Sequence, residues 1–361
     1  MEPESPFNCL PNELVTKIAE YVKAADLPCF RLTCTRFNDN SYSSFGINFI
    51  RFRRHVFSPH ALEELAAIVA HPILGRHVRY ICIGSTRLVQ RGCSATSCRL
   101  ERDEEAYRRK LDEQNVFLSQ GHAAKLLERV FTLIQGYGNE VAIGTVSDHD
   151  GETHVHHSGW GWKQRREDEA IDWPSDISSY EHRPLETISM LLSAAVKSNC
   201  SISDVCIESS RSSDCLPSIP NQFSYADIQF SAAKIRRLEL SMMIKTDEDA
   251  EELGNLLYPL LKDNATLESL DININDHRKA SNNKTFAWLL ALPSKRLREL
   301  CLTGITMDTD SYTQLLDKHR TTLRGLKLHF GGMLAGREQW AVDEWITGNL
   351  KLNYKMIIFS R

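Results

Sequence analysis

Residues 146–183 hold the side chains best suited to chemistry at a small site. Four histidines and two aspartates lie close together in this polar stretch: Asp148, His149, Asp150, His154, His156 and His157. Imidazole and carboxylate groups of this kind are ligands for zinc. Structural zinc sites draw on two spaced ligand pairs, however, and no second Cys or His pair follows at a suitable spacing. The pattern therefore predicts a metal-free loop.

Three other groups of residues fit more than one interpretation. Trp160 and Trp162 flank a glycine beside basic residues, and they fit either a binding hot spot or a cover over the core. The segment RFRRH (51–55) mixes basic and aromatic residues. It fits a phosphate or nuclear-import patch, but the solvated end of a helix is the favoured interpretation. Cys93 and Cys98 lack a second pair, which argues against a metal knuckle.

Sequence patterns of the common enzyme classes are absent. The chain contains no G-x-S-x-G, G-x-x-x-x-G-K-[ST], H-E-x-x-H or G-x-G-x-x-G. These patterns mark activated nucleophiles, phosphate loops, catalytic zinc sites and dinucleotide-binding turns. We therefore expect a protein that is not an enzyme, with no catalytic residues, no cofactor and no metal.

Composition sets further bounds. The 361 residues are 42% hydrophobic and 25% charged, with a formal net charge of -4, which is ordinary for a globular protein and gives no general attraction for nucleic acid. No apolar run approaches the ~20 residues of a membrane-spanning helix, and the N-terminus, MEPESP, lacks a secretory signal. Ten cysteines without framework spacing indicate free thiols. We expect a cytoplasmic or nuclear protein with no membrane partner.

The first forty residues carry two apolar stripes at helical spacing. Leu14, Ile18 and Val22 recur four residues apart. A second stripe follows at Leu27, Phe30, Cys34 and Phe37, with Asp26 as a candidate N-cap. If the stripes pack on each other, Val15, Leu32 and the Leu10–Pro11 step are left outside. A unit of fewer than ~40 residues usually needs support, so it should dock on the rest of the chain or on another protein.

The stretch LPNELVTKIAEYVKAADLPCFRLTCTRF resembles the F-box motif closely. Its recurrent residues stand in the family's order: Leu10, Pro11, Glu13, Leu14, Ile18, Asp26, Leu27, Arg31, Leu32, Cys34 and Phe37. The resemblance implies binding to the Skp-type adaptor of Skp–cullin–F-box ubiquitin ligases, and through it to a cullin. The residues expected to bind the adaptor are Leu10, Pro11, Leu14, Val15, Ile18, Leu27, Leu32 and Phe37. In this family other subunits perform the chemistry, and the F-box protein brings the substrate close to the enzyme that transfers ubiquitin.

An apolar pattern, L-x-x-L-x-L, recurs after residue 77. Four copies follow at intervals of about 30 residues, as IRRLEL (235–240), LESLDI (267–272), LRELCL (297–302) and LRGLKL (323–328). Earlier copies are VRYICI (78–83), EVAI (140–143) and ISDVCI (202–207). Strand, turn and helix in repetition resemble an irregular leucine-rich-repeat solenoid. Because only Asn275 matches that family's asparagine or cysteine at the ninth position, a generic α/β domain stays the alternative.

These elements predict an α/β chain with three parts. A helical F-box module covers 1–45, a helical linker 46–77 and a leucine-rich-repeat-like substrate domain 78–361. Two polar insertions, 86–122 and 146–183, interrupt the repeats. The first insertion contains a charged run, RLERDEEAYRRKLDEQN, that predicts a solvated helix.

The residues between the apolar positions of each strand should line one concave face of the solenoid. Side chains alternate between faces along a strand, so this face can be read from the sequence. Acidic residues outnumber basic ones there, which predicts a protein substrate with a basic segment. The residues expected to bind it are Tyr80, Glu208, Arg237, Glu239, Asp271, Glu299 and Lys327. The alternative binding surface is the loops or the C-terminal end near Trp340 and Trp345.

The favoured function is that of a non-catalytic substrate-recognition subunit of a Skp–cullin–F-box E3 ubiquitin ligase. Two alternatives stay open. One is an F-box scaffold protein without a degradation substrate. The other is an enzyme or metal-binding protein that shares only the N-terminal helices.

Overall fold

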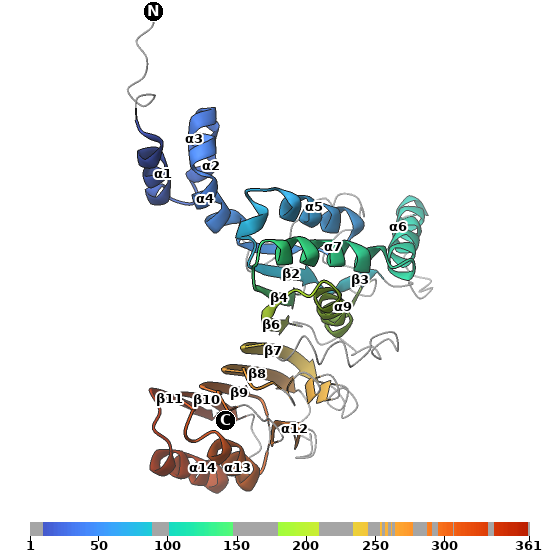
Figure 1. Ribbon diagram of the computed structural model, residues 1–361. Helices are drawn as coiled ribbons and strands as arrows, with labels where there is room; N and C mark the ends of the chain where they lie inside the picture. Colours follow the sequence, from blue (N-terminus) through green and yellow to red (C-terminus); the bar gives the residue numbers. More distant parts are fainter. Residues whose placement is uncertain are drawn as a thin grey trace, which may run out of the picture.

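Helices and parallel strands alternate along most of the chain. The computed structural model describes residues 10–88, 101–146, 180–208, 234–244, 253–254, 257–258, 261, 264–276, 287–290, 295–305, 307–330 and 336–359. In Figure 1 the N-terminal helices project at the top, and the strands are stacked below them toward β11.

The N-terminal module consists of short helices. They are α1 (Asn12–Tyr21), α2 (Leu27–Leu32), α3 (Thr35–Asn40) and α4 (Tyr42–Phe45), followed by a π-helical segment, η2 (Gly46–Ile50). Pro28 lies in the first turn of α2, where its missing N–H is harmless. The second apolar stripe does not form one helix as expected, because the backbone is extended at Cys34 and separates α2 from α3.

Nine strands form one parallel sheet in the order β1-β2-β4-β6-β7-β8-β9-β10-β11. Their bounds are β1 (Phe52–His55), β2 (Tyr80–Gly84), β4 (Val141–Val146), β6 (Ile202–Glu208), β7 (Arg237–Ile244), β8 (Ser269–Asp276), β9 (Glu299–Thr303), β10 (Gly325–Phe330) and β11 (Tyr354–Phe359). Neighbouring strands thus follow chain order, and all seven predicted strands are present. The sheet extends by one strand at each end, β1 and β11, which the repeat pattern did not predict.

In the connections that the structure describes, helices cover one face of the sheet (Figure 1). They are α5 (Pro59–Ala70), the 3-10 turn η3 (Gly75–His77), α7 (His122–Gly136), α9 (Pro184–Lys197), α12 (Ala287–Leu290), α13 (Thr309–Lys318) and α14 (Gly336–Asn349). We call the opposite face of the sheet the open face. This arrangement confirms an α/β fold in which a helical module precedes a nine-stranded parallel sheet.

The apolar positions of the repeat build the core. The strands are in register, so Leu238, Leu270, Leu300 and Leu326 form one row across four strands. Leu240, Ile272, Leu302 and Leu328 form the next row, and both rows are at most 2% exposed. Each row is a continuous apolar strip that no single repeat could bury alone.

The sheet begins before residue 78, inside the segment expected to be a helical linker. β1 pairs in parallel with β2, and α5 packs on α7. The segment RFRRH is therefore mainly an edge strand and not a helix end. The repeat pattern did not predict β1, because Arg53 and His55 stand where aliphatic residues would be expected, opposite Ile81 and Ile83. His55 is fully buried, and burial with the Arg53 charge lowers its pKa to about 3.

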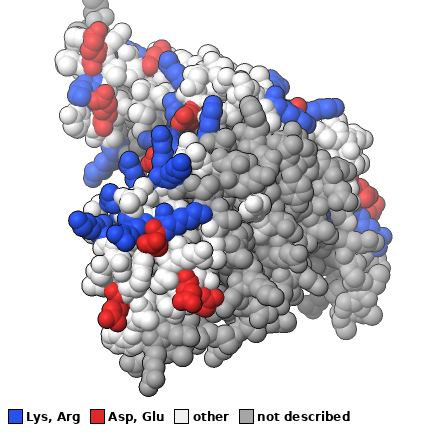
Figure 2. Space-filling model, turned by 60° about the horizontal axis from the view of Figure 1, so that its bottom comes forward, with Lys and Arg blue, Asp and Glu red and all other residues white. Residues whose placement is uncertain are grey.

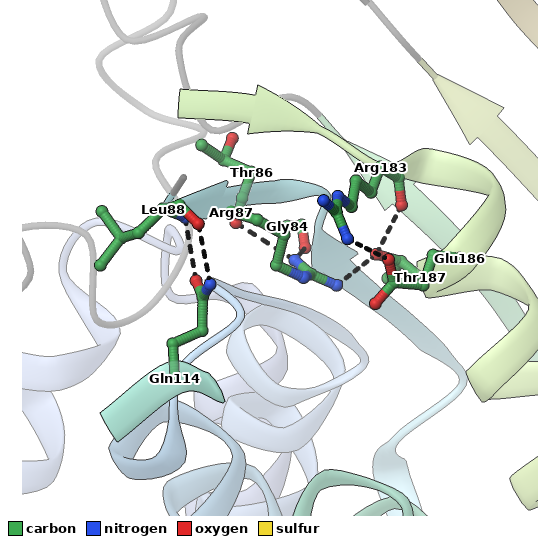
Figure 3. Close-up of polar contacts among 8 residues, drawn as sticks. All are labelled: Gly84, Thr86, Arg87, Leu88, Gln114, Arg183, Glu186 and Thr187. Carbon is green, nitrogen blue, oxygen red and sulfur yellow. Dashed lines mark hydrogen bonds and ion pairs between the residues drawn. The ribbon is translucent and has the colours of Figure 1, made fainter. Parts of the chain in front are cut away.

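The two insertions contact each other. β3 (Thr86–Leu88) from the first pairs in antiparallel fashion with β5 (Tyr180–His182) from the second. The charged run forms α6 (Glu101–Ser119), but this helix is not solvated on all sides as expected. Gln114 is nearly buried and bonds both the N–H and the C=O of Leu88, each at 3.0 Å (Figure 3). Its amide therefore holds α6 against β3.

Arg87 of β3 anchors these segments to the sheet (Figure 3). Its guanidinium donates to the carbonyl oxygens of Gly84 and Thr86, each at 3.1 Å, and to Thr187 Oγ1 on α9 at 2.6 Å. The charge also lies 3.4 Å from the ring centroid of Phe57. A side chain that is 1% exposed needs such partners, because an uncompensated buried charge is strongly destabilising.

Candidate protein-binding surfaces

The helices α1 and α2 expose an apolar surface. Val15, Ala19 and Leu27 point inward and are at most 1% exposed. The predicted packing of the first stripe was wrong, because Leu14 and Ile18 face outward with exposed fractions of 49% and 39%. We define the F-box face by its strongly exposed apolar side chains, Leu14, Ile18, Tyr21 and Leu32.

The predicted adaptor residues divide into two groups by burial. Pro11, Leu14, Ile18 and Leu32 are exposed, and Leu10 and Phe37 are half-buried. Val15 and Leu27 lie in the interior of the module. Phe37 stacks on Phe30 with ring centroids 4.7 Å apart. Only the exposed group is free to contact a partner without rearrangement, whereas Val15 and Leu27 hold the helices together.

Arg31 connects α2 to the helices that follow. Its guanidinium lies 4.5 Å from the ring centroid of Tyr42 and 4.0 Å from that of Phe45, and it donates to Asn38 Oδ1 at 2.7 Å. Partial burial lowers the pKa of Arg31 from its usual value. Gly46 then approaches the ring of His77 so closely that any side chain at position 46 would collide with it. The F-box helices are thereby packed against the start of the sheet domain.

The open face of the sheet carries two rows of side chains that the register fixes. The first row runs through Phe52, Tyr80, Ala142, Asp204, Arg237, Ser269, Glu299, Gly325 and Tyr354. The second runs through Arg54, Cys82, Gly144, Cys206, Glu239, Asp271, Cys301, Lys327 and Met356. Most of these side chains are half-buried or exposed from β6 onward, whereas Cys82, Ala142 and Gly144 on β2 and β4 are buried.

The structure brings five of the predicted substrate residues together on β7 to β10. Glu239 and Asp271 are direct neighbours in one row, and Glu299 lies on the strand after them. We call Glu239, Asp271 and Glu299 the acidic patch. Glu208 lies one row further along β6, beside Ser241 of β7.

Basic residues border the acidic patch without neutralising it. Arg237 pairs with Glu239 at 3.1 Å, and both side chains are largely exposed. Lys327 of β10 is the neighbour of Cys301 in the row and lies two strands beyond Asp271. Such an exposed ion pair contributes little to stability, since solvent screens it. The patch therefore keeps a net negative charge at neutral pH.

Two thiols lie beside these carboxylates on the open face. Burial raises the pKa of Cys301 to about 12, and the hydrogen bond to Asp271 and its charge act in the same direction. Burial also raises the pKa of Cys206 to about 11, with a further contribution from Glu239. A thiolate would be close to these carboxylates, so both cysteines stay protonated at neutral pH.

Tyr80 lies at the other end of the open face, three strands before β7. Its ring stacks on Phe52 with centroids 4.3 Å apart. A side chain on Gly144 would place its Cβ only 2.6 Å from the Tyr80 hydroxyl, so glycine is needed for Tyr80 to cross β4. Burial, chiefly, raises the pKa of Tyr80. The hydrogen bond with Cys206 and the charge of Glu239 act in the same direction, so the Tyr80 hydroxyl lies near the acidic patch although its strand is three strands before β7.

Several predicted features lie outside the described residues. These are the histidine-rich loop with Trp160 and Trp162, and the cysteines Cys93 and Cys98. Within the described ranges, no group of three or more His, Cys, Asp or Glu side chains could hold a metal ion. The helices that the structure describes include none with the length and apolar character to cross a membrane. At the C-terminal end, Trp340 is 74% exposed, whereas Trp345 packs on the core.

Some exposed residues were not predicted. Tyr21 is 79% exposed and extends the F-box face by one helical turn. Tyr354 and Met356 of β11 extend the open face beyond β10. The position of Tyr21, seven residues after Leu14, is a helical signal that could have revealed it. β11 lacks the L-x-x-L-x-L pattern, so no such signal pointed to it.

Comparison with known proteins identifies one part of the chain. The sequence model of the F-box domain matches residues 7–42. No curated protein matches the chain. Among the solved structures that match is tryptophan synthase from Mycobacterium tuberculosis, which aligns over 88% of this chain and 86% of that chain, with 9% identity and a TM-score of 0.21. A TM-score this low carries no argument about fold or function.

Residues 7–42 are an F-box domain, and the nine-stranded domain that follows is not assigned to a family. Proteins with an F-box are typically non-catalytic adaptors. The domain implies binding to a Skp-type adaptor and, through it, to a cullin.

Proposed function

We propose that this chain is the substrate-recognition subunit of a Skp–cullin–F-box ubiquitin ligase in the cytoplasm or nucleus. The observation that carries the proposal is the F-box domain with the apolar side chains of Leu14, Ile18 and Leu32 exposed. Burying three aliphatic side chains of this size stabilises a complex by several kcal/mol, at about 1.5–3 kcal/mol each. A free protein gains nothing from exposing them, which supports a partner at this surface.

The adaptor contact divides into binding residues and supporting residues. Leu10, Pro11, Leu14, Ile18 and Leu32 touch the adaptor, with Tyr21 beside them. Val15 and Leu27 support these residues from the interior, and Phe37 supports them through its stacking on Phe30. This division revises the sequence-based set, in which all eight residues shared one role.

The sheet domain is the substrate receptor, an irregular solenoid of the leucine-rich-repeat type. Strands that follow chain order, helices in the connections that the structure describes and aliphatic rows on the covered face support this classification. Its substrate is a protein with a basic segment, bound on the open face by Glu208, Glu239, Asp271 and Glu299. Arg237 and Lys327 border the segment, and Tyr80 lies at its far end.

Ubiquitin-linkage proteomics tests the whole proposal. Cells that carry the full chain should ubiquitinate a set of proteins that cells with a chain lacking residues 1–45 do not. Pulldown with the full chain should recover the adaptor, the cullin and the same set of proteins. Recovery of the adaptor without any change in ubiquitination would instead support the F-box scaffold without a degradation substrate.

A further inference from the structure

A groove lies where the helices α5, α6 and α7 meet. Its volume of about 650 Å³ lies within the range of about 300–1,000 Å³ that is usual for sites of small ligands. All three helices contribute residues to its walls, and none of these residues belongs to the F-box face or to the open face. The groove is therefore a third surface of the molecule, separate from the two described above.

The base of the groove is apolar. Phe117 of α6 is 5% exposed, and its ring packs edge-on against Phe57 with the ring centroids 5.9 Å apart. The neighbouring Val116 is 48% exposed, whereas Pro59 of α5 and Leu126 of α7 are half-buried. An apolar chain in the groove would shield these side chains from water, which is a main source of affinity at such a site.

Two basic side chains line the α7 wall of the groove. Lys125 and Arg129 lie one helical turn apart, on the face of α7 that also carries His122 and Leu126. Both are exposed, and among the residues that the structure describes neither has a carboxylate within ion-pair distance. Like charges at this spacing repel each other, so an anion between them would stabilise the helix.

The carboxylates of the groove belong to the other two walls. Glu113 of α6 pairs with Lys110 at 3.1 Å, so its charge is already compensated. Glu63 of α5 has no such ion pair within the described ranges. Two cations, Lys125 and Arg129, against this one carboxylate leave the groove with a single net positive charge, and that charge lies on the α7 wall.

This positive charge is local to the groove. Figure 2 shows Lys and Arg side chains gathered mainly on its left, whereas α6 lies on the right of the molecule in Figure 1. The groove beside α6 is thus apart from the largest basic region of that view. A general attraction for polyanions therefore does not account for the two cations of the groove.

We propose that the groove binds a free fatty acid of medium chain length, with its carboxylate between Lys125 and Arg129 and its chain along Val116, Phe117 and Leu126. A carboxylate accepts charge-assisted hydrogen bonds from both cations and matches the single net positive charge. The uncharged chain avoids the carboxylates of the other walls. The proposal is independent of the proposed function, because the groove shares no residue with the F-box face or the open face.

The length of the groove limits the ligand. The stretch of α7 that lines it, from His122 to Arg129, covers about 10 Å, since an α-helix rises about 1.5 Å per residue. A chain of medium length fits this span. A much longer chain would extend into solvent and gain no further affinity from burial.

Two larger partners fit the charges of the groove less well. A partner helix rich in acidic residues would bring several carboxylates close to Glu63 and Glu113, and like charges across an interface repel. An anionic bilayer attracts clusters of about four to eight basic residues. Lys125 and Arg129 beside two carboxylates do not form such a cluster.

Isothermal titration calorimetry of the full chain with hexanoate, octanoate and decanoate tests the proposal. Each acid is titrated below its micelle concentration. We expect affinity to rise about tenfold or more from octanoate to decanoate, because each buried methylene contributes about fourfold. Decanol has the same chain without the charge, and it should bind about tenfold more weakly than decanoate, since the hydrogen bonds between charged groups are lost.

Three variants separate the charge from the apolar base. Lys125→Gln/Arg129→Gln should remove the preference for decanoate over decanol but keep the dependence on chain length. The matched control, Arg320→Gln/Lys351→Gln, removes one Lys and one Arg from exposed positions outside the groove and should bind like the wild type. Val116→Trp fills the groove and should weaken both ligands about tenfold or more. All five substituted residues are exposed, so thermal unfolding without ligand should match the wild type.

Three results would overturn the proposal. They are equal binding of decanoate and decanol to the wild type, equal losses in the charge variant and its control, and binding of anionic phospholipid vesicles through Lys125 and Arg129 without binding of free decanoate. Adaptor binding should be unchanged in all three variants. A failed titration with intact adaptor binding would therefore remove only this site and leave the proposed function standing.

Discussion

The F-box face and the open face of the sheet present partners with opposite kinds of surface. The F-box face is small and apolar, with Leu14, Ile18 and Leu32 on two neighbouring helices. The open face is wide and polar, and its charges change from strand to strand. The affinity of an apolar surface grows with the apolar area that the partner buries, and such a surface suits one constant partner. A charged surface selects by complementarity, so it suits a partner that must be distinguished from others.

The largest effect is expected on the F-box face. Leu14→Ala/Ile18→Ala/Leu32→Ala should weaken adaptor binding by about a thousandfold or more, because each lost aliphatic contact costs about 1.5 kcal/mol or more. Titration calorimetry with purified adaptor measures this. Lys17→Ala/Glu20→Ala, which removes an exposed ion pair from the same helix, is the control and should bind normally. If the triple variant bound with wild-type affinity, the adaptor would not dock on these residues.

A substitution in the interior of the same module should lower its stability and affect adaptor binding only through that loss. Leu27→Ala leaves a cavity where the side chain is fully buried, at a cost of about 2–5 kcal/mol. Limited proteolysis should show residues 10–45 opening, while thermal unfolding of the sheet domain is unchanged. An adaptor excess should restore binding, since binding stabilises the folded module. Loss of affinity without loss of protease resistance would place Leu27 at the contact itself.

The first stripe shows why burial could not be predicted for the F-box. Leu14 and Ile18 have the spacing of a core face, and an apolar face that awaits a partner gives the same pattern as one that packs internally. Val15 and Ala19, one position further round the helix, are the residues that pack. The resemblance to the F-box motif supplied the partner, but it could not tell which residues touch it.

The sheet domain was more predictable in its middle than at its ends. Alternation along L-x-x-L-x-L placed Leu238, Leu240 and their neighbours in the core and Glu239 and Asp271 on the open face. β1 was missed because Arg53 and His55 replace aliphatic residues at an edge. The contact between β3 and β5 joins segments about ninety residues apart, and no local pattern records a pairing over that distance.

The acidic patch should give a smaller effect than the F-box face, and one that depends on salt. Glu239→Lys/Asp271→Lys should weaken capture of a basic peptide by about tenfold at low salt. The difference should shrink as ionic strength rises, because exposed charges are screened within ~8 Å at physiological salt. Asp317→Lys/Glu344→Lys makes the same charge change on exposed residues of the helical side and is the control. An equal loss in the control would show a general charge effect and not a binding surface.

The smallest expected effect is on the thiol of Cys301. Asp271 raises the pKa of this thiol, so Asp271→Asn should lower it and increase the thiolate fraction. Since the pKa is about 12, the wild-type thiol stays protonated to well above pH 9. We expect several-fold faster alkylation by iodoacetamide at pH 9 in the variant, followed by mass spectrometry. Cys29, which is exposed on α2, should react at the same rate in both proteins. An unchanged rate at Cys301 would mean that Asp271 does not act on it.

The packing of Gly46 against His77 fixes the F-box helices to the first strands of the sheet. The F-box helices run into the first strand through η2 without a flexible spacer in the described residues, so the strand count sets how far a bound segment lies from the adaptor. Five strand spacings separate β1 from β8, which places the acidic patch about 24 Å along the sheet from its first strand. Gain or loss of one repeat would move the cargo by about 4.8 Å and rotate it with the sheet twist. If the proposed function holds, the number of repeats between the two surfaces sets which lysines of a bound protein come within reach of the transferring enzyme.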